Sequence, residues 1–162
     1  MRTTLMTALA VFLADQLSKF IVLYLLDLDE IGEIEVISPF FQLQMAWNKG
    51  INFGLFAGFD MRWVLIALAL SISVGVIYWV HRDGKTKWTF VAAGMLVGGA
   101  LGNVLDRVIY GAVADFLNFS CCGLNNPYAF NIADVAVFAG AAALVFTSSE
   151  SSDTNTRTKK KN

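Results

Sequence analysis

The chain has 162 residues, of which 56% are hydrophobic and 15% are charged, and its formal net charge is −1. Soluble domains carry roughly 25% charged residues, whereas here the apolar residues gather in runs long enough to cross a bilayer. The composition therefore excludes an ordinary soluble domain, gives no sign of a nucleic-acid partner, and predicts a polytopic membrane protein with a single domain.

The first apolar segment, 5–26, begins like a secretory signal. It has no A-x-A-like cleavage site, however, and Asp15 and Lys19 interrupt its apolar run. We therefore expect a retained transmembrane helix rather than a removed peptide.

A polar outer segment, 27–60, follows and opens with five acidic residues. Alternation of polar and apolar residues around Phe41, Leu43 and Met45 predicts a short strand or two. The part between residues 35 and 56 is amphipathic, so we expect it to lie at the membrane interface.

Three more apolar segments complete a prediction of four transmembrane helices. They cover residues 61–80, 88–105 and 131–147. A second outer segment, 106–130, separates the last two. The polar tail, 148–162, is expected to be disordered, so residues 1–147 form the predicted membrane domain.

Lysine and arginine set the predicted orientation. With four spans, the basic residues of the N-terminus, of the loop 81–87 and of the tail all fall on one side. The positive-inside rule places that side in the cytoplasm. Both termini are then cytoplasmic, and the two outer segments face outside.

Charged and amide residues cluster between the last two spans, where they are costly to place and by default mark a functional site. Asp115 follows the third span, and Asp134 lies in the first turn of the fourth. Two carboxylates in one site of low dielectric constant can share a proton, which is what aspartic proteolysis needs. The alternatives are a turn residue at Asp115 and, at Asp134, a helix N-cap or a first-turn carboxylate; Asn131 could be the cap instead.

Other polar residues near the spans have structural alternatives too. Asp15 and Lys19 share a helix face and could form an ion pair that orients two helices. They should lie roughly 10 Å or more deeper than the aspartate pair, which argues against direct catalysis by them. Arg107 could reach the interface, pair with Asp106 or bias the ionisation of the pair.

Glycines Gly94, Gly98 and Gly102 share one face of the third span, which favours close helix packing and could also admit a substrate helix. Cys121 and Cys122 are adjacent, so they form no disulfide framework and no metal-ligand spacing. The sequence predicts neither a metal nor a cofactor.

Five motifs, in order along the chain, together resemble the lipoprotein signal peptidase (signal peptidase II) family. The motifs are Asp15-Gln-Leu-Ser-Lys19, Asn48-Lys-Gly-Ile-Asn-Phe-Gly54, Gly98-Gly-Ala-Leu-Gly-Asn-Val-Leu-Asp-Arg107, Val113-Ala-Asp-Phe116 and Phe130-Asn-Ile-Ala-Asp134.

The resemblance implies an aspartic endopeptidase of the bacterial inner membrane that cuts diacylglyceryl-modified prolipoproteins just before the lipid-bearing cysteine. It implies four transmembrane helices, an outer β-cradle with an interfacial helix, contact with membrane lipid, and inhibition by globomycin. Asp115 and Asp134 match the catalytic aspartates. The matching supporting positions are Asp15, Lys19, Asn48, Gly50, Gly99, Asn103, Arg107, Asn131 and Ala133.

Two other classes of function also fit the spans. A small proton-coupled carrier would use Asp15 and Lys19 at mid-membrane and would tolerate changes at Asp115 and Asp134. A scaffold protein would need the glycine face and neither carboxylate. Within the peptidase interpretation, we expect segment 35–56 to clamp the substrate and to move during turnover.

Overall fold

The computed structural model describes residues 1–50, 60–84, 86–120 and 126–159, the last twelve of them by their backbone alone. The helices are α1 (Arg2–Phe20), extended by a π-helical turn (Ile21–Leu25), α2 (Leu28–Ile31), α3 (Met61–Asp83), α4 (Lys87–Tyr110) and α5 (Ile132–Lys159). The strands are β1 (Glu33–Ile37), β2 (Phe41–Asn48) and β3 (Val113–Phe119).

Among the described residues, three helical stretches are long and apolar enough to cross a membrane. They are Arg2–Leu25, Met61–Asp83 and Lys87–Tyr110. The apolar part of α5, Ile132–Thr147, is shorter. The protein is therefore mostly helical and of membrane type, and its described residues form three membrane-length helices and a small sheet.

Helix α4 is the centre of the bundle, and α1, α3 and α5 all pack against it. Its glycines allow the closest approaches. A Cβ atom at Gly94 would lie 2.6 Å from the Thr4 carbonyl oxygen, and one at Gly98 would overlap the backbone of Ala8. The predicted glycine face is thus confirmed as a packing face against α1.

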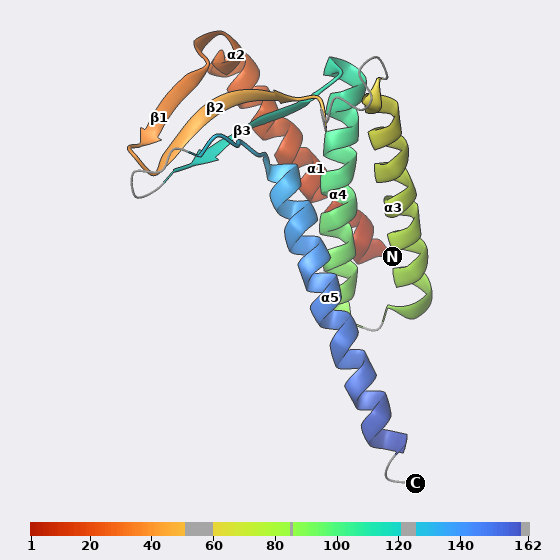
Figure 1. Ribbon diagram of the computed structural model, residues 1–162. Helices are drawn as coiled ribbons and strands as arrows, with labels where there is room; N and C mark the ends of the chain where they lie inside the picture. The colour runs from red at the N-terminus through yellow and green to blue at the C-terminus, as the bar shows by residue number, and fades with distance from the viewer. Residues whose placement is uncertain (51–59, 85, 121–125, 160–162) are drawn as a thin grey trace.

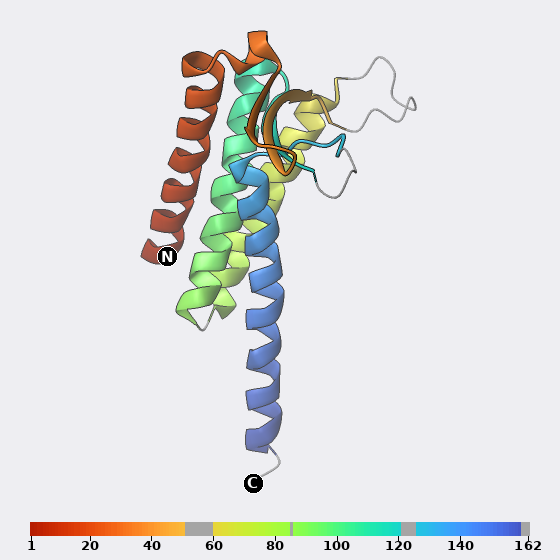
Figure 2. The same ribbon diagram turned by 90° about the vertical axis from the view of Figure 1, so that its left-hand side faces the viewer.

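The sheet joins two polar segments that are far apart in the sequence. Its strands run antiparallel in the order β1-β2-β3, and β2 pairs with β3 so that Ala46 lies opposite Asp115. The sheet lies at one end of the bundle, and both chain termini lie toward the other end (Figures 1 and 2).

Helix α4 ends at a glycine that turns the chain into β3. Gly111 has φ 77°, in the left-handed region that favours glycine, and its amide donates to the Arg107 carbonyl. Two residues later the strand begins, anchored by Phe116, which is 2% exposed and packs with Val22 and Leu28. This turn places Asp115 beside the C-terminal end of α4.

The structure differs from the sequence analysis in the surroundings of Asp115 and in the tail. The alternative of a turn at Asp115 is wrong, because this residue lies on β3. The strand gave no alternating pattern in the sequence, because it is buried along most of its length. Residues 148–159 are helical where we predicted disorder. A helix already formed by the apolar part of α5 can extend without a new nucleation cost.

Some sequence expectations fall outside the described residues. These are the parts of the outer segments at 51–59 and 121–125, including Cys121 and Cys122, and the tail end at 160–162.

Candidate active site

Asp115 is held by amide groups from two other parts of the chain. Its side chain is only 3% exposed. The Asn131 side-chain amide donates to Oδ1 at 2.7 Å, and the Asn48 side-chain amide donates to Oδ2 at 3.0 Å. Both oxygens of the buried carboxyl group are therefore satisfied, as buried polar groups require.

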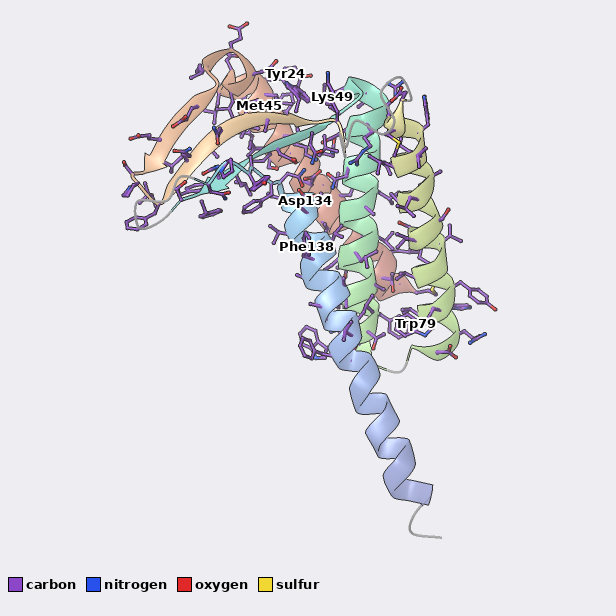
Figure 3. All side chains as sticks on the ribbon, viewed as in Figure 1. Tyr24, Met45, Lys49, Trp79, Asp134 and Phe138 are labelled. Atoms are coloured by element: carbon purple, nitrogen blue, oxygen red, sulfur yellow. The ribbon has the colours of Figure 1, made fainter. Side chains whose placement is uncertain are left out.

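Asp134 is the third residue of α5 and lies at the end of that helix nearest the sheet (Figure 3). Asn131 Oδ1 accepts a hydrogen bond from the Asp134 backbone amide at 2.8 Å, and Asp134 Oδ2 accepts from the Asn131 backbone amide at 3.4 Å. This reciprocal pair is a capping box. Of the two possible caps, the structure has Asn131, and the first-turn position of Asp134 is confirmed.

Two asparagines connect the aspartates. The Asn131 side-chain amide also donates to Asn103 Oδ1 at 3.1 Å, and the Asn103 amide donates to Asp134 Oδ1 at 2.8 Å. A continuous chain of hydrogen bonds therefore runs from Asp115 through Asn131 and Asn103 to Asp134. The fold brings these four residues together from β3, α4 and the start of α5.

The surroundings of Asp115 favour its neutral form. Burial, and then the negative charge of Asp134, raise the pKa of Asp115 to about 6. The hydrogen bonds from Asn48 and Asn131 and the positive charge of Lys19 oppose this change. A carboxyl group with a pKa near 6 can hold or release a proton close to neutral pH.

A pocket of about 500 Å³ opens beside Asp115. Its lining combines polar and apolar side chains from the sheet, the helices and the segment before α5. They are Ala46, Trp47, Asn48, Gly50, Leu65, Arg107, Asp115, Pro127, Tyr128 and Ala129. Arg107 donates to the Asn103 carbonyl at 3.1 Å, which keeps its cationic group near both the pocket and the aspartate pair.

The predicted ion pair in α1 is confirmed, but its predicted depth is wrong. Lys19 Nζ lies 2.7 Å from Asp15 Oδ2 and 2.6 Å from Asp106 Oδ2. Asp15 Oδ1 accepts from the backbone amide of Ala133 at 2.9 Å, one residue before Asp134. The predicted depth was counted from residue positions along α1. That count did not include where α5 begins, and the start of α5 lies beside the Asp15 side chain.

The two remaining predicted residues, Gly50 and Gly99, contact residues that neighbour the aspartates. The Gly50 amide donates to Asn48 Oδ1 at 2.9 Å, and this contact helps to fix the side chain that contacts Asp115. A Cβ atom at Gly99 would overlap the Ala133 carbonyl oxygen, so glycine allows α4 to approach the start of α5.

Sequence reasoning missed the structural parts played by Gln16 and Asn118. Gln16 Nε2 lies 3.1 Å from both Asp15 Oδ2 and Asp106 Oδ1. The fully buried Asn118 amide donates to the carbonyls of Asn126 at 2.7 Å and Tyr128 at 3.1 Å. In the sequence, each of these residues is an amide within a largely apolar segment, and this could have marked both as buried hydrogen-bonding residues.

Within the part of the chain that the structure describes, no three His, Cys, Asp or Glu side chains form a group suited to a metal ion.

Comparison with known proteins identifies the family. The family model described as signal peptidase (SPase) II matches residues 7–149. The chain belongs to the signal peptidase II family. It is therefore a peptidase of the bacterial membrane, and a proton-coupled carrier is not favoured.

Curated relatives agree with this assignment. A lipoprotein signal peptidase of Nitrobacter hamburgensis is 37% identical over 153 residues, covering 91% of this chain and 92% of the relative. One of Paraburkholderia phymatum is 40% identical over 141 residues, covering 86% of this chain and 82% of the relative.

Solved structures show the same fold. Two structures described as bacterial membrane enzymes are each 28% identical to this chain, with TM-scores of 0.77 and 0.79. The match to the first structure covers 94% of this chain and 90% of the chain in that structure. The match to the second covers 91% of this chain and 92% of the other.

Proposed function

We propose that the enzyme is an aspartic endopeptidase that removes the signal peptide of diacylglyceryl-modified prolipoproteins by cutting before the lipid-bearing cysteine. Family membership supports peptidase action on prolipoproteins. The observation that carries the aspartic assignment is the hydrogen-bonded chain that joins Asp115 to Asp134 through Asn131 and Asn103, beside an open pocket.

In the proposed reaction, one carboxyl group acts as base and the other as acid. We assign the base to Asp134, which lies in the first turn of α5 beside the positive end of the helix dipole. It takes a proton from water while the water oxygen bonds to the scissile carbonyl carbon. Asp115, whose pKa is raised to about 6, donates its proton to the carbonyl oxygen.

Collapse of the tetrahedral intermediate then breaks the peptide C–N bond. The proton held by Asp134 passes to the leaving amine, and the hydroxyl proton of the intermediate returns to Asp115. The pair therefore ends as it began, with one proton between two carboxyl groups.

The proposed membrane arrangement follows the same reasoning. We propose that α1, α3, α4 and the apolar part of α5 cross the bilayer, within a single domain that comprises residues 1–147. The termini lie toward the end of the bundle opposite the sheet (Figure 1), which supports an outer sheet and cytoplasmic termini. The sheet would then be the extracytoplasmic cradle, with the expected interfacial helix and the substrate clamp in the outer segment 27–60.

The pocket suits a substrate that is part peptide and part lipid. Asn48, Arg107 and Asp115 offer polar groups to a peptide backbone, whereas Trp47, Leu65 and Tyr128 offer apolar surface. We propose that the inhibitor globomycin occupies this pocket and competes with the prolipoprotein.

The substrate assignment is tested with purified enzyme and one prolipoprotein prepared with and without its diacylglyceryl group. We expect a single cut directly before the lipidated cysteine, seen by mass spectrometry of the products, and suppression of this cut by globomycin. Equal cleavage of the unlipidated protein, or a cut elsewhere, would contradict the assignment.

A further inference from the structure

The residue before each candidate catalytic aspartate donates its backbone amide to a buried carboxylate. The amide of Ala114, before Asp115, lies 3.2 Å from Asp106 Oδ2. The amide of Ala133, before Asp134, lies 2.9 Å from Asp15 Oδ1. The two contacts are made to different helices, α4 and α1.

One lysine joins these two carboxylates. Lys19 Nζ lies 2.7 Å from Asp15 and 2.6 Å from Asp106. The side chains of the three residues are 3%, 0% and 1% exposed respectively. Gln16 donates to the same two carboxylates at 3.1 Å each.

We propose that Asp106, Lys19 and Asp15 are positioning residues that fix the separation of Asp115 and Asp134 by holding the backbone immediately before each of them. We call these three residues the amide clamp. The inference rests on the proposed function, because it assumes that Asp115 and Asp134 do the chemistry. Asp106 lies within one of the five motifs but is not among the supporting positions that the resemblance implies. Its positioning role is inferred from these contacts.

Helix packing alone does not explain why these charges are buried. The glycine face of α4 already brings it against α1 at Gly94 and Gly98. Removing a lysine and two carboxylates from water is costly, and apolar side chains of similar volume often replace such groups without loss of stability. Hydrogen bonds from backbone amides to charged carboxylates are directional and stronger than neutral ones, so they suit a role in fixing backbone position.

The test compares two replacements of Asp106 of similar size. Asp106→Asn keeps an oxygen that can accept from the Ala114 amide, whereas Asp106→Leu keeps the volume and removes every acceptor. We expect kcat to fall about 10-fold in the first and about 100-fold in the second, the loss typical of a misplaced catalytic group. KM should stay within about 2-fold, because Asp106 does not line the pocket.

Amide hydrogen exchange supplies a readout independent of turnover. Exchange at Ala114 should rise in Asp106→Leu, with a smaller rise in Asp106→Asn, while exchange at Ala133 stays close to wild type. The matched control is Asp83→Asn, which alters an exposed carboxylate paired with Arg82 in α3 and should change neither kcat nor exchange.

Asp115→Asn and Asp134→Asn are measured in parallel, so that failure of the proposed function can be distinguished from failure of the amide clamp. If either retains turnover, the proposed function fails. If both are inactive, a folded Asp106→Leu with wild-type kcat overturns the amide clamp alone. Should Asp106→Leu not fold, Asp106→Asn decides: a lowered kcat with faster Ala114 exchange supports the clamp, and unchanged values overturn it.

Discussion

Ionisation of Asp115 should destabilise the folded protein. An aspartate has an ordinary pKa of 3.8, and burial together with the charge of Asp134 raises the pKa of Asp115 to about 6. A carboxyl group whose pKa is raised on folding contributes stability that is fully present below pH 3.8 and is lost as the pH rises through about 6. The same environment that keeps a proton available therefore lowers stability at neutral and alkaline pH.

The size of this effect follows from the pKa difference. One pKa unit corresponds to about 1.4 kcal/mol, so complete ionisation of Asp115 costs the folded state about 3 kcal/mol. Because the pocket beside Asp115 is open to solvent, part of that cost is screened. We expect about 1–2 kcal/mol between pH 4.5 and pH 8, or a few degrees in Tm for a chain of this size.

Asp115→Asn removes the titration. It also replaces one carboxyl oxygen, which accepts from Asn48 or Asn131, by an amide donor, but that loss is the same at every pH. Thermal unfolding of the detergent-solubilised variant and wild type at both pH values measures the effect, with exposed Asp60→Asn as the control. Relative to wild type, Asp115→Asn should gain stability as the pH rises, and the control should not. An equal difference between variant and wild type at both pH values would refute this reasoning.

Two further predictions concern the packing around the site. Lys19→Met leaves two buried carboxylates without their cation, and chemical denaturation should show a free energy of unfolding lower by about 3–5 kcal/mol. In the same assay, Arg82→Met, at an exposed ion pair, should cost about 0–1 kcal/mol; equal losses would contradict this prediction. Gly102→Ala places a Cβ atom 2.6 Å from Asp15 Oδ2 and should reduce turnover, whereas Gly75→Ala meets nothing within 4 Å and should leave it unchanged. Wild-type turnover in Gly102→Ala would show that the Asp15 carboxylate can move without consequence.

Some of this architecture could be read from the sequence. Long apolar runs predicted the helices, because membrane-length segments need no tertiary information to be recognised. Glycines spaced four apart predicted the α4 packing face for the same local reason. The motifs around Asp15, Asn48 and Asp134 predicted the family, which the comparisons confirm.

Contacts between distant segments could not be read in this way. Strand β3 is buried along most of its length, so no alternation revealed it. Asp106 pairs with Lys19 rather than with its neighbour Arg107, since the arrangement of α1 against α4 decides which cation is near. The contact from Asp15 to the Ala133 amide depends on where α5 begins in space, which periodicity does not specify.

The most direct test of the central claim is cleavage of a diacylglyceryl-modified prolipoprotein by purified wild type, Asp115→Asn, Asp134→Asn and the control Asp83→Asn. Each substitution removes one ionisable group and keeps the side-chain shape, and folding is checked by thermal unfolding. We predict cleavage by wild type and the control, and none by the two folded site variants. Near-normal turnover in either site variant would contradict the assignment of Asp115 and Asp134 as the catalytic pair.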